Sequence, residues 1–112
     1  MGDDDHRGYV PPHMRKLKLV QTLLPNQRPT RSELIAIIAY EWGYKVSQQS
    51  KIFSQSEKTV RTHLQKAHEK VYAANATEAI WLIERCEWLD VDLRADIEKE
   101  INSYVRNWEA QL

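Results

Sequence analysis

Residues 56–72 read SEKTVRTHLQKAHEKVY, and this stretch decides the fold of the chain. Ser56 is a favourable N-cap, because its hydroxyl accepts a hydrogen bond from a backbone N–H group of the first helical turn. Glu57 then stands at the positive end of the helix dipole. Apolar side chains recur at the period of one helix face: Val60, Leu64, Ala67 and Val71. The sequence therefore predicts a helix over 57–72 with one buried face.

The opposite face of this helix is short, polar and basic. Arg61 and Gln65 are four residues apart, so they lie on the same side. The DNA major groove admits one helix and offers hydrogen-bond acceptors on guanine and donor–acceptor pairs on adenine. Thr62 is suited to contact with a thymine methyl group, and three side chains are suited to phosphates: Lys58, Thr59 and Lys66. A solvated surface face is the alternative interpretation, because protein surfaces are normally charged.

A capping box predicts another helix upstream. Thr30 and Glu33 have the residue types and spacing of this motif, which satisfies two backbone donors at a helix N-terminus. The helix is expected to reach residues 40–42. Gly43 follows, and glycine is favoured where a helix ends in a positive-φ conformation.

A short helix is predicted between these two. Residues 46–53 span about two turns at 3.6 residues per turn, with Val46 and Phe53 directed inward. Residues 54 and 55, Ser and Gln, then form the tight connection of a helix-turn-helix unit.

Residues 30–89 resemble the DNA-binding domain of the LuxR/GerE response-regulator family. The run 57–63 is close to the family's most recognisable sequence, and residues 75–79 resemble the entry into its fourth helix. Gln49 and Gln55 depart from the pattern, because the family usually has isoleucines there, and the apolar register of the first helix is shifted. Region 4 of sigma factors shares a related pattern. The matching residues are Thr30, Glu33, Gly43, Ser56, Thr59, Val60 and His63.

The resemblance implies an all-α, four-helix domain over 30–89 that reads double-stranded DNA with helix 57–72, without a cofactor. Family members usually carry a receiver or ligand-sensing domain ahead of this module. Only twenty-nine residues precede Thr30, so we expect a standalone regulator without direct control by phosphorylation or an autoinducer. The implied base-reading residues are Arg61, Thr62 and Gln65. The implied backbone-binding residues are Ser56, Lys58, Thr59 and Lys66.

Charge is unevenly distributed along a chain whose formal net charge is zero. Residues 1–29 carry five basic and three acidic side chains, and residues 30–72 carry seven and four. Residues 73–112 carry four and nine, a net charge of −5. The positive part therefore coincides with the proposed reading helix, as DNA binding requires.

The segment before Thr30 divides into two parts. Residues 1–13 contain an Asp3-Asp4-Asp5 run and a proline pair, and we expect them to be irregular. Residues 14–29 are interpreted as a short helix that packs on the core. The alternative is a basic arm that contacts the DNA backbone with three side chains: Arg15, Lys16 and Lys18.

A fourth helix is predicted over 77–89, and a long amphipathic helix capped by Asp90 or Asp92 over 90–112. Their apolar side chains can pack in the same subunit, form a homodimer, or bind RNA polymerase or another regulator. We favour the homodimer, because a four-helix domain is expected to have a closed core without the last helix and a two-fold dimer spaces two reading helices about one DNA turn apart. The candidate interface comprises Trp81, Leu93, Ile97, Ile101, Tyr104 and Trp108.

Other function classes have little support. Nothing resembles a signal peptide or a membrane span, so a cytoplasmic location is expected. Cys86 is interpreted as a buried structural thiol rather than a redox switch. His63 and His68 are five residues apart and no neighbouring ligand set completes a zinc site. A phosphate-binding glycine loop is also absent, and an enzyme is not expected.

Two hypotheses remain. The first is a sequence-specific DNA-binding transcription regulator. The second is an interaction protein that binds another regulator or RNA polymerase through its aromatic, acidic C-terminal half. The first predicts a steep fall in affinity with salt and loss of site preference on Arg61→Ala, whereas the second predicts protein binding that survives this change.

Overall fold

The computed structural model describes residues 14, 15, 17, 18, 21 and 28–112. The first five of these residues are helical. Residues 28–112 contain no strand, which confirms the predicted all-α class for this part of the chain. The helices are α3 (Arg31–Glu41), α4 (Val46–Ile52), α5 (Glu57–Lys70), α6 (Ala76–Arg85) and α7 (Val91–Ala110).

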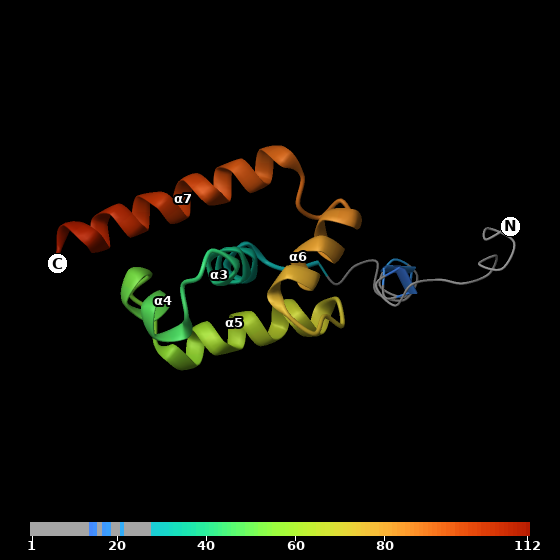
Figure 1. Ribbon diagram of the computed structural model, residues 1–112, viewed down its shortest axis with the longest axis horizontal. Coiled ribbons are helices and arrows are strands. Elements are labelled where there is room, and N and C mark those ends of the chain that lie inside the picture. Colours follow the sequence, from blue (N-terminus) through green and yellow to red (C-terminus); the bar gives the residue numbers. More distant parts are fainter. Residues whose placement is uncertain (1–13, 16, 19–20, 22–27) are drawn as a thin grey trace, which may run out of the picture.

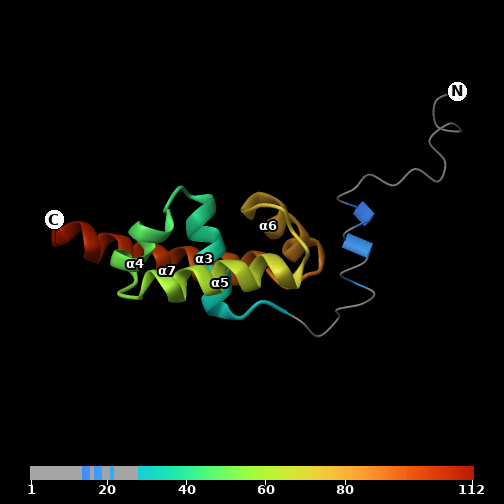
Figure 2. The same cartoon turned by 90° about the horizontal axis from the view of Figure 1, so that it is seen from below.

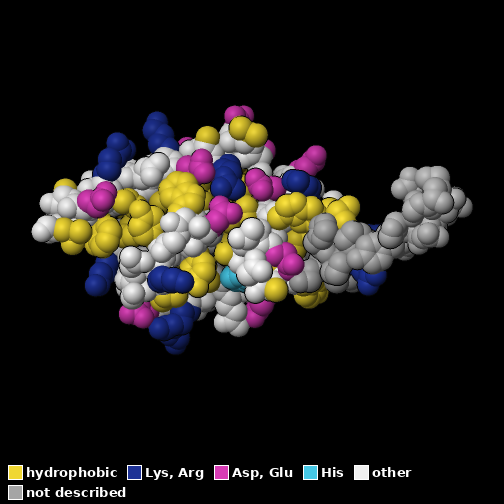
Figure 3. Space-filling view, viewed as in Figure 1, with side chains coloured by type: hydrophobic (Ala, Val, Ile, Leu, Met, Phe, Trp, Pro, Cys, Tyr) yellow, Lys and Arg dark blue, Asp and Glu magenta, His cyan; other side chains and the backbone are white. Residues whose placement is uncertain are grey.

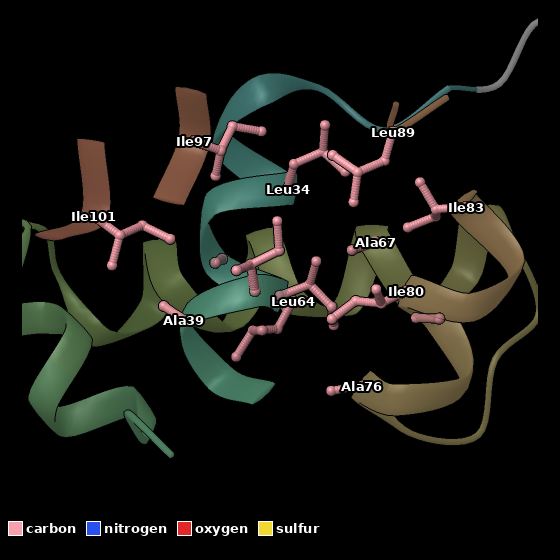
Figure 4. Close-up of a cluster of buried hydrophobic side chains, with 14 of the residues drawn as sticks. Leu34, Ala39, Leu64, Ala67, Ala76, Ile80, Ile83, Leu89, Ile97 and Ile101 are labelled. Carbon is pink, nitrogen blue, oxygen red and sulfur yellow. The ribbon is translucent and has the colours of Figure 1, made fainter. Parts of the chain in front are cut away.

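Helix α3 lies at the centre of the fold and contacts each of the other four helices. Figure 1 shows α7 above it and α5 below it. Residues 34–39 are consecutive apolar side chains, and nearly all of them are buried, so α3 is apolar around its whole circumference. A helix of this kind has to be covered on every side. Figure 4 shows Leu34 of α3 beside Leu89, which lies between α6 and α7.

The predicted N-termini of α3 and α5 are confirmed. Thr30 Oγ1 accepts from the N–H of Glu33 at 3.2 Å, and Glu33 Oε1 accepts from the N–H of Thr30 at 3.0 Å. Ser56 Oγ accepts from the N–H of Thr59 at 3.0 Å. Gly43 has φ = +99°, as predicted for the residue after α3. The buried stripe of α5 is also confirmed: Val60, Leu64, Ala67 and Val71.

The predicted C-terminal ends of two helices lie too far along the chain. Helix α5 ends at Lys70 rather than Tyr72, because Tyr72 turns the chain away with φ = +54°. Helix α6 ends at Arg85 rather than Leu89, and Glu87 makes the corresponding turn with φ = +62°. In both cases a non-glycine residue adopts the left-handed conformation, which sequence rules assign mainly to glycine.

Helix α4 is held by a residue that apolar patterning does not identify. Gln49 is fully buried, and its Nε2 donates to the carbonyl oxygens of Ala36 at 3.0 Å and Tyr44 at 2.9 Å. Ile52 is also buried, whereas Val46 and Phe53 are only half-buried. The Gln49 side chain thus joins α4 to α3 and to the loop after it.

Helix α7 packs across α3 and α4 of its own chain. Ile97 and Ile101 are fully buried there, so the favoured assignment of these two residues to a dimer interface is wrong. Val105 continues the buried stripe of α7. Tyr104 is 42% exposed, and its ring packs edge to face on the Phe53 ring with 5.3 Å between the ring centres. The physical reason is the apolar circumference of α3, whose remaining side is covered by α7.

Two arginines connect α7 to its neighbours. Arg31 of α3 binds Asp96 and Glu100 of α7, and hydrogen bonds to Glu100 and then Asp96 raise the pKa of Arg31. Burial lowers the pKa of Arg94, but its hydrogen bonds to Glu41 and Glu98 outweigh this effect, and the net pKa is raised. Both guanidinium groups therefore stay charged across the usual pH range.

One ion pair fixes α5 against α3. Lys70 Nζ lies 2.7 Å from Glu33 Oε1, and the Glu33 side chain is only 5% exposed. The same carboxylate oxygen accepts the N–H of Thr30 in the capping box. Glu33 thus joins the start of α3 to the end of α5.

Candidate nucleic-acid interface

Helices α4 and α5 form a tight two-helix unit. Phe53 caps α4, Ser54 takes φ = +52°, and Ser56 caps α5. The Ser50 side chain donates to the carbonyl of Gln55 at 2.5 Å, and the N–H of Gln55 donates to the carbonyl of Ser50 at 3.0 Å. Figure 2 shows α5 in front of α3 and α7, with α4 beside its beginning. This short connection confirms the predicted turn at residues 54–55.

The three predicted base-reading residues are exposed together on α5. Arg61, Thr62 and Gln65 lie opposite the buried Val60 and Ala67. The Arg61 side chain is 63% exposed. The structure therefore leaves this face of α5 uncovered by any residue that it describes.

Each of these three side chains already has a partner on its own helix. Arg61 Nη2 binds Glu57 Oε1 at 2.9 Å, and Gln65 Nε2 donates to Glu69 Oε1 at 2.8 Å. The Thr62 hydroxyl donates to the carbonyl of Lys58 at 2.9 Å. The two acidic partners were missed from the sequence, although their four-residue spacing is a recognised signal.

The four predicted backbone-binding residues are also exposed. Two of them hold the start of α5, since Ser56 Oγ accepts from the N–H of Thr59 and donates to its hydroxyl at 2.8 Å. Lys58 lies three positions before Arg61, and Lys66 lies one position after Gln65. Figure 3 shows Lys and Arg side chains along the lower edge, where α5 lies, beside a few Asp and Glu side chains, and side chains of both signs in the upper half.

The proposed basic arm is described only in part. Arg15 and Lys18 are exposed, and Leu17 between them is 8% exposed and belongs to the core cluster. Lys16 and the irregular segment predicted over 1–13 lie outside the described residues. The burial of Leu17 therefore supports the predicted packing of this segment on the core, with the Arg15 and Lys18 side chains exposed.

The remaining candidate interface residues pack against the core of the same chain. Trp81, Leu93 and Trp108 are half-buried against the core cluster. The Arg85 guanidinium lies 4.9 Å from the centre of the Trp81 ring, a distance typical of a cation–π interaction.

Cys86 is half-buried rather than fully buried, at the C-cap of α6. Within the described ranges no helix is long and apolar enough to cross a membrane. The same residues contain no cluster of three or more His, Cys, Asp or Glu side chains suited to a metal ion.

Burial raises the pKa of the Cys86 thiol. A raised thiol pKa favours the neutral form, and only the thiolate reacts rapidly. We expect iodoacetamide to modify Cys86 more slowly in the native protein than in urea, with the midpoint of the pH–rate curve above the ordinary value of about 8.5. Mass spectrometry over a pH series measures both. A native midpoint at or below the ordinary value would contradict the expectation.

Comparison of the chain with family models, curated proteins and solved structures finds no match.

Proposed function

We propose that this protein is a sequence-specific, double-stranded DNA-binding transcription regulator that reads the major groove with α5. The observation that carries the proposal is the exposed face of α5, on which Arg61, Thr62 and Gln65 stand together above a buried stripe. The short α4–α5 connection supports it, because it presents α5 as the second helix of a helix-turn-helix unit.

The internal partners of these side chains do not prevent base contacts. A surface pair four residues apart on a helix contributes only about 0.2–0.5 kcal/mol. A good bidentate contact to a base contributes about 1–3 kcal/mol of discrimination. The cost of breaking the Glu57 pair is therefore smaller than the discrimination that an Arg61 contact to guanine supplies.

The proposal includes a homodimer on DNA, because a two-fold pair of reading helices matches a two-fold symmetric site. Ile97 and Ile101 are committed to the core, so any subunit contact has to use side chains that remain outside it. Binding to a DNA site with two half-sites would therefore support the homodimer.

Selection of bound sequences from a random duplex pool tests the proposal. Wild type is expected to enrich one motif, and Arg61→Ala is expected to lose the preference at the position that Arg61 reads. The matched control is Arg106→Ala, which removes an exposed arginine from α7 and should retain the motif. Affinity for the motif should fall steeply with salt, because phosphate binding releases counterions.

Three outcomes separate the hypotheses. A two-fold symmetric motif supports dimeric reading, and a single half-site supports reading by one subunit. Absence of any motif with wild type contradicts DNA reading by α5. That result would favour the protein-interaction role of the C-terminal half, which has the net charge of −5.

A further inference from the structure

The exposed side of α5 includes a carboxylate that the sequence did not assign to DNA. The buried stripe of this helix comprises Val60, Leu64, Ala67 and Val71. A second stripe has the same spacing and starts two positions earlier, which is about 200° around a helix of 3.6 residues per turn. All four of its residues are exposed: Lys58, Thr62, Gln65 and Glu69. Glu69 therefore lies on the side of α5 that faces away from the core.

The Glu69 carboxylate is hydrogen-bonded to a predicted base-reading side chain. Gln65 Nε2 donates to Glu69 Oε1 at 2.8 Å. This contact fixes the orientation of the Gln65 amide, because a carboxylate accepts hydrogen bonds and does not donate them. Glu69 Oε2 accepts from no residue that the structure describes. Successive bases of one strand are about 3.4 Å apart, so the carboxylate reaches the base beside the one that Gln65 contacts.

The Gln65 amide can read a base without releasing Glu69. A side-chain amide has two N–H donors and one carbonyl acceptor. With one N–H group on Glu69, the other N–H group and the carbonyl remain, and adenine requires this pair at N7 and N6. Guanine presents two acceptors, N7 and O6, so the Gln65 carbonyl would face one of them. The contact with Glu69 therefore directs Gln65 to adenine.

The second oxygen of Glu69 is itself selective among bases. In the major groove cytosine presents an N4 amino donor, and a carboxylate accepts from this group. Guanine and thymine present acceptors, which repel a carboxylate. A carboxylate is also repelled by every phosphate, so it adds no general attraction to DNA. Its contribution to an interface is therefore discrimination between bases.

We propose that Glu69 is a specificity-determining residue of the DNA interface, whose carboxylate accepts from the N4 amino group of a cytosine beside the adenine that Gln65 reads. This inference rests on the proposed function, because it requires α5 to enter the major groove. It adds a base preference that Arg61, Thr62 and Gln65 do not supply. The binding site is expected to contain an adenine and a cytosine in neighbouring base pairs, on the same strand or on opposite strands.

Binding to two matched duplexes tests the inference. The first is the motif selected by wild type from the random pool. In the second this cytosine is replaced by thymine, which puts an acceptor in place of the amino donor. We expect wild type to bind the second duplex about five- to 150-fold more weakly, and Glu69→Ala to bind the two within about twofold. Fluorescence anisotropy measures both affinities, and their ratio cancels any general gain from the loss of a negative charge.

Three further measurements complete the test. Gln65→Ala should lose the preference for adenine and keep the preference for cytosine, because Glu69 reads cytosine itself. Glu109→Ala removes an exposed carboxylate from α7 and should behave as wild type does. Thermal unfolding should show that Glu69→Ala is folded, since surface substitutions of this kind change stability little.

Three results would overturn the inference alone, because the motif itself would persist. They are a wild-type motif without a cytosine beside the adenine, a cytosine preference that survives in Glu69→Ala, and a cytosine preference that disappears in Gln65→Ala. The last result would show that Glu69 acts only through Gln65. Absence of any wild-type motif would overturn the proposed function and this inference together.

Discussion

Replacement of Ile101 by Ala is expected to lower the free energy of unfolding by about 2–5 kcal/mol, because it opens a cavity in a packed core. Ile101 is fully buried where α7 covers α3 and α4. Urea unfolding followed by circular dichroism measures the loss. The midpoint should be the same at low and high protein concentration, since the contact lies within one chain.

Val91→Ala is the matched control. Val91 is an apolar residue of the same helix but is 84% exposed, so its truncation should change stability by less than about 0.5 kcal/mol. If Ile101 instead packed against a second subunit, the unfolding midpoint of wild type would rise with protein concentration. Such a rise that disappears in Ile101→Ala, or similar losses in the two variants, would contradict the packing of α7 in its own chain.

Lys70→Met is expected to lower the free energy of unfolding by about 3 kcal/mol, at the lower end of the cost of leaving a buried charge unpaired. Among the described residues, the Glu33 carboxylate would keep only the N–H of Thr30 as a partner. The Lys70 side chain is 24% exposed, so some solvent reaches the site and moderates the effect. Thermal and urea unfolding at neutral pH measure the change.

The control for this variant is Lys66→Met, one helical turn earlier on α5. Lys66 is exposed and forms no ion pair with a described residue, so its replacement should leave stability nearly unchanged. The double variant Glu33→Gln, Lys70→Met should recover part of the loss, because no buried charge remains. Additive losses in the double-mutant cycle would show that the two side chains are not coupled.

The sequence predicted the features that depend on near neighbours. The Thr30–Glu33 capping box, the Ser56 cap and the buried stripe of α5 each involve residues three or four positions apart. Such spacings determine the geometry of a helix turn before any tertiary contact forms. The same reasoning placed Arg61, Thr62 and Gln65 on one exposed face.

The contacts between distant segments could not be predicted in this way. Glu33 and Lys70 are 37 positions apart, and nothing local pairs them. Gln49 is polar, so apolar patterning does not identify it as the residue that joins α4 to α3. The position of α7 did have a signal that was missed: residues 34–39 are all apolar, and a helix without a polar face needs one more covering helix than the four-helix domain supplies.

The layered order of the helices separates electrical charge across the molecule. Helix α3 lies between α5 and α7, residues 30–72 have a net charge of +3, and residues 73–112 have −5. Residues 30–112 therefore form an electric dipole, positive toward α5 and negative toward α7. Near a polyanion, the electric field exerts a torque that turns α5 toward the polyanion and α7 away from it. The protein is therefore oriented before the two molecules touch. Added salt screens the torque over a Debye length of about 10 Å at 0.1 M.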